Sequence, residues 1–121
     1  MMVWRGIRSI SAAIVLQMFF ANAAFADSGR VALLIGNSAY EHLPALDNAA
    51  SDAQAIAAAL ESYGYEVVSA IDADKNQIRD SLNRFIERSQ GAEAALIFYA
   101  GHGLQAGGVN YILPVDARMR S

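Results

Sequence analysis

One of the two histidines of this 121-residue chain lies between two glycines at the end of an apolar run. His102 belongs to the stretch IFYAGHGLQAGG, residues 97–108, and follows the seven apolar residues Ala94–Ala100 and Gly101. Imidazole exchanges protons near neutral pH, so this side chain suits general acid–base catalysis. The alternative is a histidine that only stabilises a turn, and the residue type alone leaves both interpretations open.

Other catalytic and ligand-binding patterns are absent or incomplete. The chain has no cysteine, which excludes a disulfide framework, a thiolate zinc site and a thiol nucleophile among these residues. A metal site would need His42 and His102 with carboxylates, and no ligand spacing supports one. Gly101-x-Gly103-x-x-Ala106 matches a dinucleotide-binding pattern, but that pattern must open a helix, and glycines and β-forming residues follow it here. We expect no metal and no cofactor.

Composition indicates one folded domain that does not bind nucleic acid. Hydrophobic residues make up 55% of the chain and charged residues 17%, which is enough apolar surface to form a core. The length suits a single core of modest size. The net charge is −3 and the basic residues are scattered, whereas a nucleic-acid-binding protein presents a basic patch.

The first 26 residues have the pattern of a secretory signal peptide. Two arginines precede an uncharged apolar stretch at residues 10–20, and Ala24-Phe25-Ala26 offers small residues for cleavage. This stretch is shorter than the roughly 20 residues that cross a membrane, although an uncleaved anchor is the alternative. We expect residues 1–26 to be a signal peptide and residues 27–121 to be a domain exported to the bacterial periplasm or secreted. No stable membrane insertion is expected after cleavage.

Apolar patterning predicts three strands that alternate with two helices. Residues 30–36 and 94–100 are continuous apolar runs of the kind buried on both faces of a sheet, and residues 65–70 are rich in β-branched and aromatic types. The β-α-β-α-β order favours a parallel sheet with helices on both faces. In the strand order 2-1-3, the ligand crevice would lie between the first and third strands. Residues 107–117 should form a glycine turn and a short hairpin segment.

Helix boundaries follow from capping residues. Ser51 and Gln54 are spaced as a capping box for the first helix, which should stop near Gly64. Asp74 is the expected N-cap of the second helix, and Gly91 would end it.

The second helix is expected to be amphipathic. Asp80 and Arg84 are spaced to form an ion pair on its outer side. Its predicted apolar face comprises Ile78, Leu82, Phe85 and Ile86.

Three segments in this order resemble a known family: RVALLIGNSAY, LDNAASDA and FYAGHG followed by GGVNYILPVDA. They resemble the large-subunit (p20) region of caspase-like cysteine peptidases, peptidase family C14, and are most similar to bacterial metacaspase-type members. The resemblance covers residues 30–117. It implies an α/β three-layer sandwich of the caspase-haemoglobinase type, with a mostly parallel sheet and helices on both faces, here truncated after the third main strand.

The resemblance also implies roles for individual residues. His102 matches the catalytic histidine of a Cys–His dyad, and Gly103 matches the glycine whose N–H helps to hold the oxyanion. Asp52 and Ala100 match substrate-binding positions. In metacaspase-type members the acid at the Asp52 position lines a specificity pocket for arginine or lysine. The alternative for Asp52 is an acid that only stabilises a helix N-terminus.

The family's nucleophilic cysteine follows its histidine by roughly 50 residues, and this chain ends at Ser121. We therefore expect a cysteine endopeptidase domain of which these residues carry the histidine half and are inactive alone. The partner is a peptide or protein substrate, and the unpaired sheet edge should promote association. The alternative function is an inactive caspase-fold module that binds peptides. Calcium occurs in the family, but no acidic cluster with loop-ligand spacing supports it here.

Overall fold

Three parallel strands form the centre of the sheet in the computed structural model, which describes residues 14–15 and 29–120. β2 (Arg30–Gly36) lies between β3 (Tyr65–Ile71) and β4 (Ala94–Ala100), which is the 2-1-3 order that the expected ligand crevice requires. Gly36 is in register with Ile71 on one side and with Ala100 on the other. The three strands therefore end at the same level, and their carboxyl ends form one edge of the sheet.

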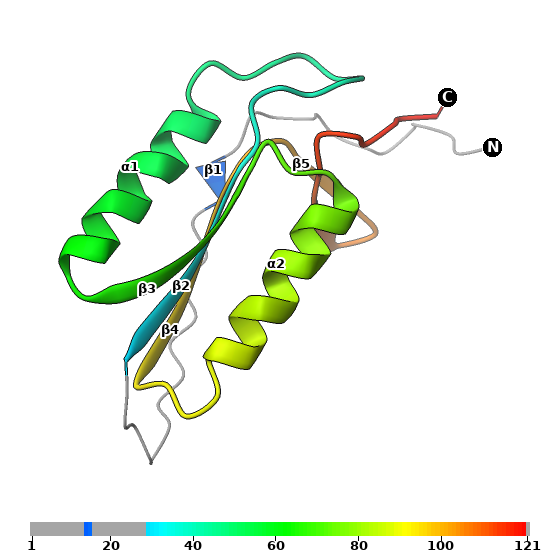
Figure 1. Ribbon diagram of the computed structural model, residues 1–121. Helices are drawn as coiled ribbons and strands as arrows, with labels where there is room; N and C mark the ends of the chain where they lie inside the picture. The colour runs from blue at the N-terminus through cyan, green and yellow to red at the C-terminus, as the bar shows by residue number, and fades with distance from the viewer. Residues whose placement is uncertain (1–13, 16–28, 121) are drawn as a thin grey trace.

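Two helices cover opposite faces of this sheet, as predicted (Figure 1). α1 (Ala49–Ser62) packs on the face formed by alternate residues such as Leu34 and Phe98. α2 (Lys75–Arg88) packs on the other face, against residues such as Leu33. Alternate residues of the apolar strands therefore supply two separate cores, one for each helix.

Gly36 brings the start of α1 to the carboxyl edge of the sheet. A Cβ atom at this position would lie 2.5 Å from Ala53 Cβ and 2.8 Å from the carbonyl oxygen of Ala49. These separations are too short for any side chain, so the glycine permits the first turns of α1 to pack against the end of β2. The first helical turn, which contains Asp52, consequently belongs to the same edge as the end of β4.

One capping prediction is confirmed and the other is wrong. Asp74 caps α2 and forms a capping box with Gln77, as N-terminal capping rules require. α1 begins at Ala49, before the predicted Ser51–Gln54 box, and its N-cap residue makes no side-chain cap. Instead, Ser38 Oγ accepts a hydrogen bond from Ala50 N–H at 2.8 Å. A loop residue twelve positions away supplies the cap, which a local pattern cannot indicate.

α2 differs from the prediction both on its apolar face and on its outer side. Phe85 is buried and Ile78 is partly buried, but Leu82 and Ile86 are 37% and 48% exposed because they lie on one flank of the helix. The predicted Asp80–Arg84 ion pair is wrong. In the described part of the chain the two side chains do not pair within 4.0 Å, and Arg84 donates to Ser81 Oγ instead.

A short hairpin follows β4. β5 (Gly103–Ala106) and β6 (Val109–Ile112) pair antiparallel across Gly107 and Gly108, whose φ angles of +57° and +80° suit the tight two-residue turn. This confirms the predicted glycine turn and hairpin. Neither of the described helices combines the length and hydrophobicity that crossing a membrane requires.

The fourth strand of the main sheet is very short. β1 (Ile14–Val15) pairs antiparallel with the end of β4, with Ile14 opposite Ala100 and Val15 opposite Tyr99. The rest of the predicted signal peptide lies outside the described residues, so that prediction is not tested by the structure.

Candidate active site

His102 lies where β4 ends and β5 begins, at the carboxyl edge of the sheet. Its side chain is 4% exposed. The ring atom Nε2 lies 2.7 Å from the carbonyl oxygen of Pro44, in the loop that connects β2 to α1. A carbonyl oxygen can only accept, so Nε2 carries the proton and donates it. In the neutral ring, Nδ1 then presents a lone pair.

Nδ1 of His102 is buried and has no hydrogen-bond partner among the described residues. A buried polar atom without a partner destabilises a fold by about 1–3 kcal/mol, so such atoms are uncommon outside functional sites. The ring is therefore oriented by Nε2, while Nδ1 has no partner among the described residues.

The Pro44 carbonyl is held in place by the loop's own anchors. The carboxylate of Asp72, just after β3, accepts hydrogen bonds from Ser38 N–H at 2.8 Å and Ala39 N–H at 2.9 Å. Farther along the loop, Glu41 N–H donates to the carbonyl oxygen of Val115 at 2.9 Å. The residue that orients His102 thus belongs to a loop fastened at several points.

Tyr40 contacts both the ring and the backbone of His102. The two ring centroids are 4.6 Å apart with the planes tilted by 58°, and Tyr40 Oη accepts a hydrogen bond from His102 N–H at 2.8 Å. The same hydroxyl donates to the carbonyl oxygen of Leu113 at 2.9 Å. Burial raises the pKa of Tyr40, so the hydroxyl keeps its proton at neutral pH.

Tyr99 holds the other side of the same turn. Its hydroxyl donates to the carbonyl oxygen of His102 at 2.6 Å and lies 3.2 Å from Tyr40 Oη. Burial raises the pKa of Tyr99 well above its ordinary value, so this hydroxyl is also a fixed donor. Gly101 covers the two hydroxyls. A Cβ there would lie 2.7 Å from Tyr40 Oη and closer still to Tyr99 Oη.

Asn37 completes the buried network beneath the turn. Its N–H donates to the carbonyl oxygen of Ala100 at 2.9 Å, and its side-chain amide joins Ala73 N–H to the carbonyl oxygen of Leu113. Asn37 therefore ties the end of β2 to the end of β4 through its backbone N–H, and to the segments after β3 and β6 through its side-chain amide. Every one of these groups is satisfied, which favours a single geometry for the turn.

Gly103 has a different environment from Gly101. Among the described residues, a Cβ at Gly103 would meet only the carbonyl oxygen of Tyr111, at 3.8 Å, which is an ordinary contact. The fold itself therefore has room for a side chain at this position. Its role in holding an oxyanion stays a prediction.

The two predicted substrate-binding residues lie at the same sheet edge in different settings. Asp52 is half-buried in the first turn of α1, where its N–H donates to the carbonyl oxygen of Asn48 at 2.8 Å. Its carboxylate forms no ion pair with any described residue. Ala100 is fully buried in the α1-side core, so only its backbone could meet a ligand. Both assignments stay predictions, and no contact joins either residue to the His102 ring.

Sequence reasoning missed the residues that orient His102. A backbone carbonyl such as that of Pro44 leaves no mark in a sequence, because every residue has one. Tyr40 and Tyr99 belong to the segments NSAY and FYAGHG, and two tyrosines beside the two strand ends were the available signal. The part of the chain that the structure describes holds no group of three or more metal-ligating side chains.

Comparison with known proteins identifies the class of domain. A family model described as the caspase domain matches residues 29–121. The human (Homo sapiens) mucosa-associated lymphoid tissue lymphoma translocation protein 1 is 33% identical over 88 residues, and its Mus musculus homolog is 32% identical over 88 residues. Each alignment covers 73% of this chain but only 11% of the relative. The chain therefore spans a small part of the length of these relatives.

Proposed function

Because this chain belongs to the caspase domain family, whose peptidase domains act on proteins, we propose that it supplies the histidine half of a cysteine endopeptidase site. His102 is the general acid and base. The nucleophile is a cysteine thiolate contributed by polypeptide outside the 121 residues, among which there is no cysteine. The observation that carries this proposal is the buried Nδ1 of His102, which has no described partner while Nε2 is held by Pro44.

In the first half of the reaction, Nδ1 takes the proton from the cysteine thiol. The resulting thiolate attacks the carbonyl carbon of the scissile peptide bond and forms a tetrahedral oxyanion. The ring is then an imidazolium, and the Nε2–H bond to the Pro44 carbonyl becomes charge-assisted and stronger. Pro44 therefore stabilises the charged ring at the step where it forms, without taking its proton.

In the second half, Nδ1–H protonates the departing amine as the C–N bond breaks and a thioester remains. Water, deprotonated by the same Nδ1, then hydrolyses the thioester and releases the carboxylic acid product. Gly103 N–H stabilises the oxyanion in both halves, a contribution worth on the order of 3 kcal/mol in comparable sites. The open space above Gly103 supports this role, since a substrate carbonyl can approach closely there.

Asp52 directs cleavage after arginine or lysine in this proposal. A carboxylate about 4 Å from a substrate guanidinium is attractive by roughly 4 kcal/mol at an effective dielectric of 20, before desolvation is deducted. The absence of an ion pair between Asp52 and other described residues supports this role, because the carboxylate is not neutralised within the domain. This is the metacaspase-type preference.

Hydrolysis of fluorogenic peptides tests the catalytic role. A protein extended through the downstream reading frame should cleave such peptides, and His102→Ala should lower kcat/KM on the order of 10⁴-fold, as for other members of catalytic dyads and triads. His42→Ala is the matched control, since His42 is the other histidine of the chain and should leave the rate unchanged. Equal activity of the His102→Ala variant and the parent protein would remove His102 from the mechanism.

Substrates ending in arginine, lysine or aspartate test the specificity. Asp52→Asn should selectively slow cleavage after arginine and lysine, whereas Asp47→Asn, a nearby acid before α1, should not. A preference of the parent protein for aspartate would contradict the role of Asp52.

A second candidate function is peptide binding without cleavage. The absence of cysteine from the 121 residues favours it, because the chain alone cannot form a thioester. If the extended protein binds peptides and does not hydrolyse them, this candidate replaces the first.

We also propose that the domain is exported from a bacterial cell. The two arginines, the apolar stretch and the Ala24-Phe25-Ala26 segment support export. Cell fractionation with N-terminal sequencing should find the protein outside the cytoplasm with Asp27 at or near its first residue. A cytoplasmic protein with an intact N-terminus would contradict this.

A further inference from the structure

The outer edge of β3 carries backbone groups that have no partner in the described part of the sheet. Within the described residues β3 pairs only with β2, so it ends the sheet on the side opposite to β4. Asp72 N–H points inward, where it donates to the carbonyl oxygen of Gly36 at 2.9 Å. Because backbone groups alternate along a strand, the N–H and C=O groups of Ser69 and Ile71 point outward. No described residue bonds to these outward groups.

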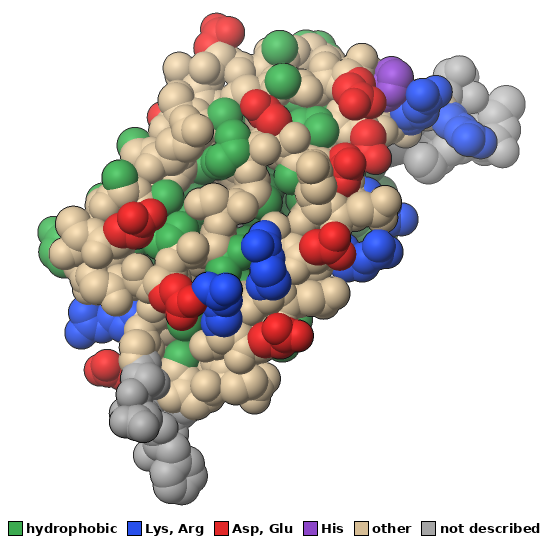
Figure 2. Space-filling model, in the orientation of Figure 1, with side chains coloured by type: hydrophobic (Ala, Val, Ile, Leu, Met, Phe, Trp, Pro, Cys, Tyr) green, Lys and Arg blue, Asp and Glu red, His purple; other side chains and the backbone are tan. Residues whose placement is uncertain are grey.

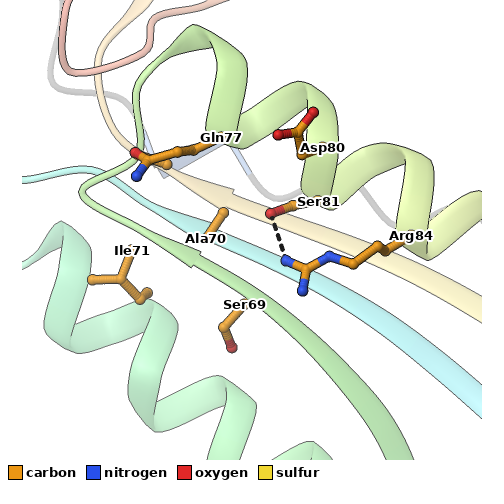
Figure 3. Close-up of a pocket in the computed structure, with 8 residues that line it drawn as sticks. Ser69, Ala70, Ile71, Gln77, Asp80, Ser81 and Arg84 are labelled. Atoms are coloured by element: carbon orange, nitrogen blue, oxygen red, sulfur yellow. Dashed lines mark hydrogen bonds between the residues drawn. The ribbon is translucent and has the colours of Figure 1, made fainter.

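A pocket of about 370 Å³ lies along this edge. Figure 3 shows that one side is formed by β3 and the other by α2. The lining residues include Gln77, Asp80, Ser81 and Arg84 from α2 and Ser69 and Ile71 from β3. The side chains of Ser69 and Ile71 point toward the α1 face of the sheet, so their backbone lines the pocket (Figure 3). In this pocket the unpaired backbone of β3 therefore lies beside polar residues of α2.

The charges in this pocket are not neutralised by each other. Arg84 donates to Ser81 Oγ at 3.3 Å, and the Asp80 carboxylate points away from the guanidinium (Figure 3). Farther along the same edge, Glu66 and Arg88 do form an ion pair. Figure 2 shows acidic and basic side chains side by side between the two helices. The edge thus has a closed, neutralised end and an open end with two unpaired charges of opposite sign.

We propose that the β3 edge and this pocket bind an extended peptide segment that carries opposite charges two residues apart. Residues four apart in a helix are separated by about 6 Å along its axis, and residues two apart in a strand by about 6.6 Å. One peptide carboxylate can therefore face Arg84 while a cationic side chain two positions away faces Asp80. The peptide backbone bonds to Ser69 and Ile71 and extends the sheet by one strand.

This site is independent of the proposed peptidase chemistry. β3 and β4 lie on opposite sides of β2, and the hydrogen-bond and ring partners of His102, which are Tyr40, Pro44, Tyr99 and Leu113, do not line the pocket. A failure of peptide cleavage would therefore leave this proposal standing, and a failure of peptide binding here would leave the proposed function standing.

Fluorescence anisotropy with the full 121-residue chain tests the site. The probes are the fluorescein-labelled peptides Thr-Thr-Lys-Thr-Asp-Thr-Thr and Thr-Thr-Asp-Thr-Lys-Thr-Thr, with a Gln/Asn version of each as a neutral control. At least one charged peptide should bind saturably, and its neutral version at least tenfold more weakly. Arg84→Glu should weaken binding of that peptide at least tenfold. The double variant Asp80→Lys, Arg84→Glu should instead bind the other charged peptide, in which Lys and Asp are exchanged.

Two further variants separate a specific site from general effects. Ser69→Pro removes one outward N–H, a change that edge strands tolerate, and should abolish binding. Arg79→Glu changes an exposed charge of α2 outside the pocket and should alter the affinity less than twofold. Circular dichroism melting checks that each variant is folded, and Asp80→Lys alone replaces Arg84→Glu if the latter unfolds.

Three results would overturn the proposal. One is the lack of saturable binding by both charged peptides, and another is equal affinity for charged and neutral peptides. The third is a rise in anisotropy that sedimentation traces only to dimers of this chain, in which case a second copy occupies the edge.

Discussion

The two glycines on either side of His102 serve opposite purposes. Gly101 covers the hydroxyls of Tyr40 and Tyr99, and no side chain fits there. Gly103 opens the β5–β6 hairpin, and among the described residues a Cβ there meets a single atom at 3.8 Å. The first glycine is required by contacts within the fold. The second is not, which agrees with its proposed role beside a substrate carbonyl.

This difference separates the support of the site from its working surface. Below the turn, the hydroxyls of Tyr40 and Tyr99 bond to the backbone of His102, and the Asn37 amide bonds to the neighbouring Leu113 carbonyl. Above it, β6 is exposed along its whole length, including Val109 and Tyr111. A rigid base and an open upper surface are what a residue needs to meet a substrate in one orientation.

The largest expected effect is that of Gly101→Ala. The added Cβ must displace two buried hydroxyls, so the variant should lose about 3 kcal/mol of unfolding free energy, at the upper end for overpacked cores. Urea denaturation followed by circular dichroism measures this loss. A change below about 1 kcal/mol would mean that the turn can shift, and the comparison of the two glycines would fail.

Tyr99→Phe should produce the next largest effect. The substitution removes the 2.6 Å donor of the His102 carbonyl oxygen, which keeps only the longer 3.2 Å bond from Leu113 N–H, so we expect a loss of about 2 kcal/mol. Tyr111→Phe is the control, because Tyr111 is half-exposed on β6 and should change stability by less than about 0.5 kcal/mol. Similar losses in both variants would show that the base of the turn is no more ordered than the hairpin.

High pH should lower the free energy of unfolding, because it ionises the tyrosines beneath the His102 turn. In the unfolded chain the two tyrosines ionise near pH 10, whereas burial raises the folded pKa of Tyr40 and Tyr99. Above pH 10 the folded state therefore binds more protons, and unfolding free energy falls with pH by up to about 1.4 kcal/mol per unit for each tyrosine. The contribution of these two tyrosines to the free energy of unfolding is fully present below pH 10. Denaturation midpoints from pH 8 to pH 11 should decline only above pH 10, and less steeply in Tyr99→Phe.

Gly103→Ala should have the smallest effect on stability. Because the fold has room for a methyl group, we expect a change below about 1 kcal/mol by urea denaturation. In the extended protein, slower peptide cleavage by this stable variant would locate the clash in the bound substrate. A large loss of stability would instead assign Gly103 to the fold and make the two glycines alike.

The arrangement of strands and helices was predictable because it depends on apolar patterning. After Arg30, the runs at residues 31–36 and 94–100 have no charged interruption, and this property makes strands at the centre of a parallel sheet recognisable. The position of His102 at the carboxyl edge of the sheet was predictable for a related reason. Its place directly after such a run determines which edge of the sheet carries it.

The contacts that orient the site were not predictable, because they join residues distant in sequence. His102 Nε2 bonds to a carbonyl 58 positions away, and the cap of α1 comes from Ser38 instead of the local Ser51. The predicted Asp80–Arg84 pair failed for the opposite reason. Spacing permits that pair, but Arg84 turns to Ser81 one turn earlier.

The short strand β1 gives the predicted export a consequence for the sheet. Ile14 and Val15 cover the backbone of Ala100 and Tyr99, immediately before the His102 turn, and both belong to the segment that a signal peptidase would remove. With residues 14–15 in place this stretch of β4 is paired, and the proposed processing would remove that partner. Maturation on the far side of the membrane would therefore uncover a strand edge two residues from the imidazole, where a newly arriving segment could pair.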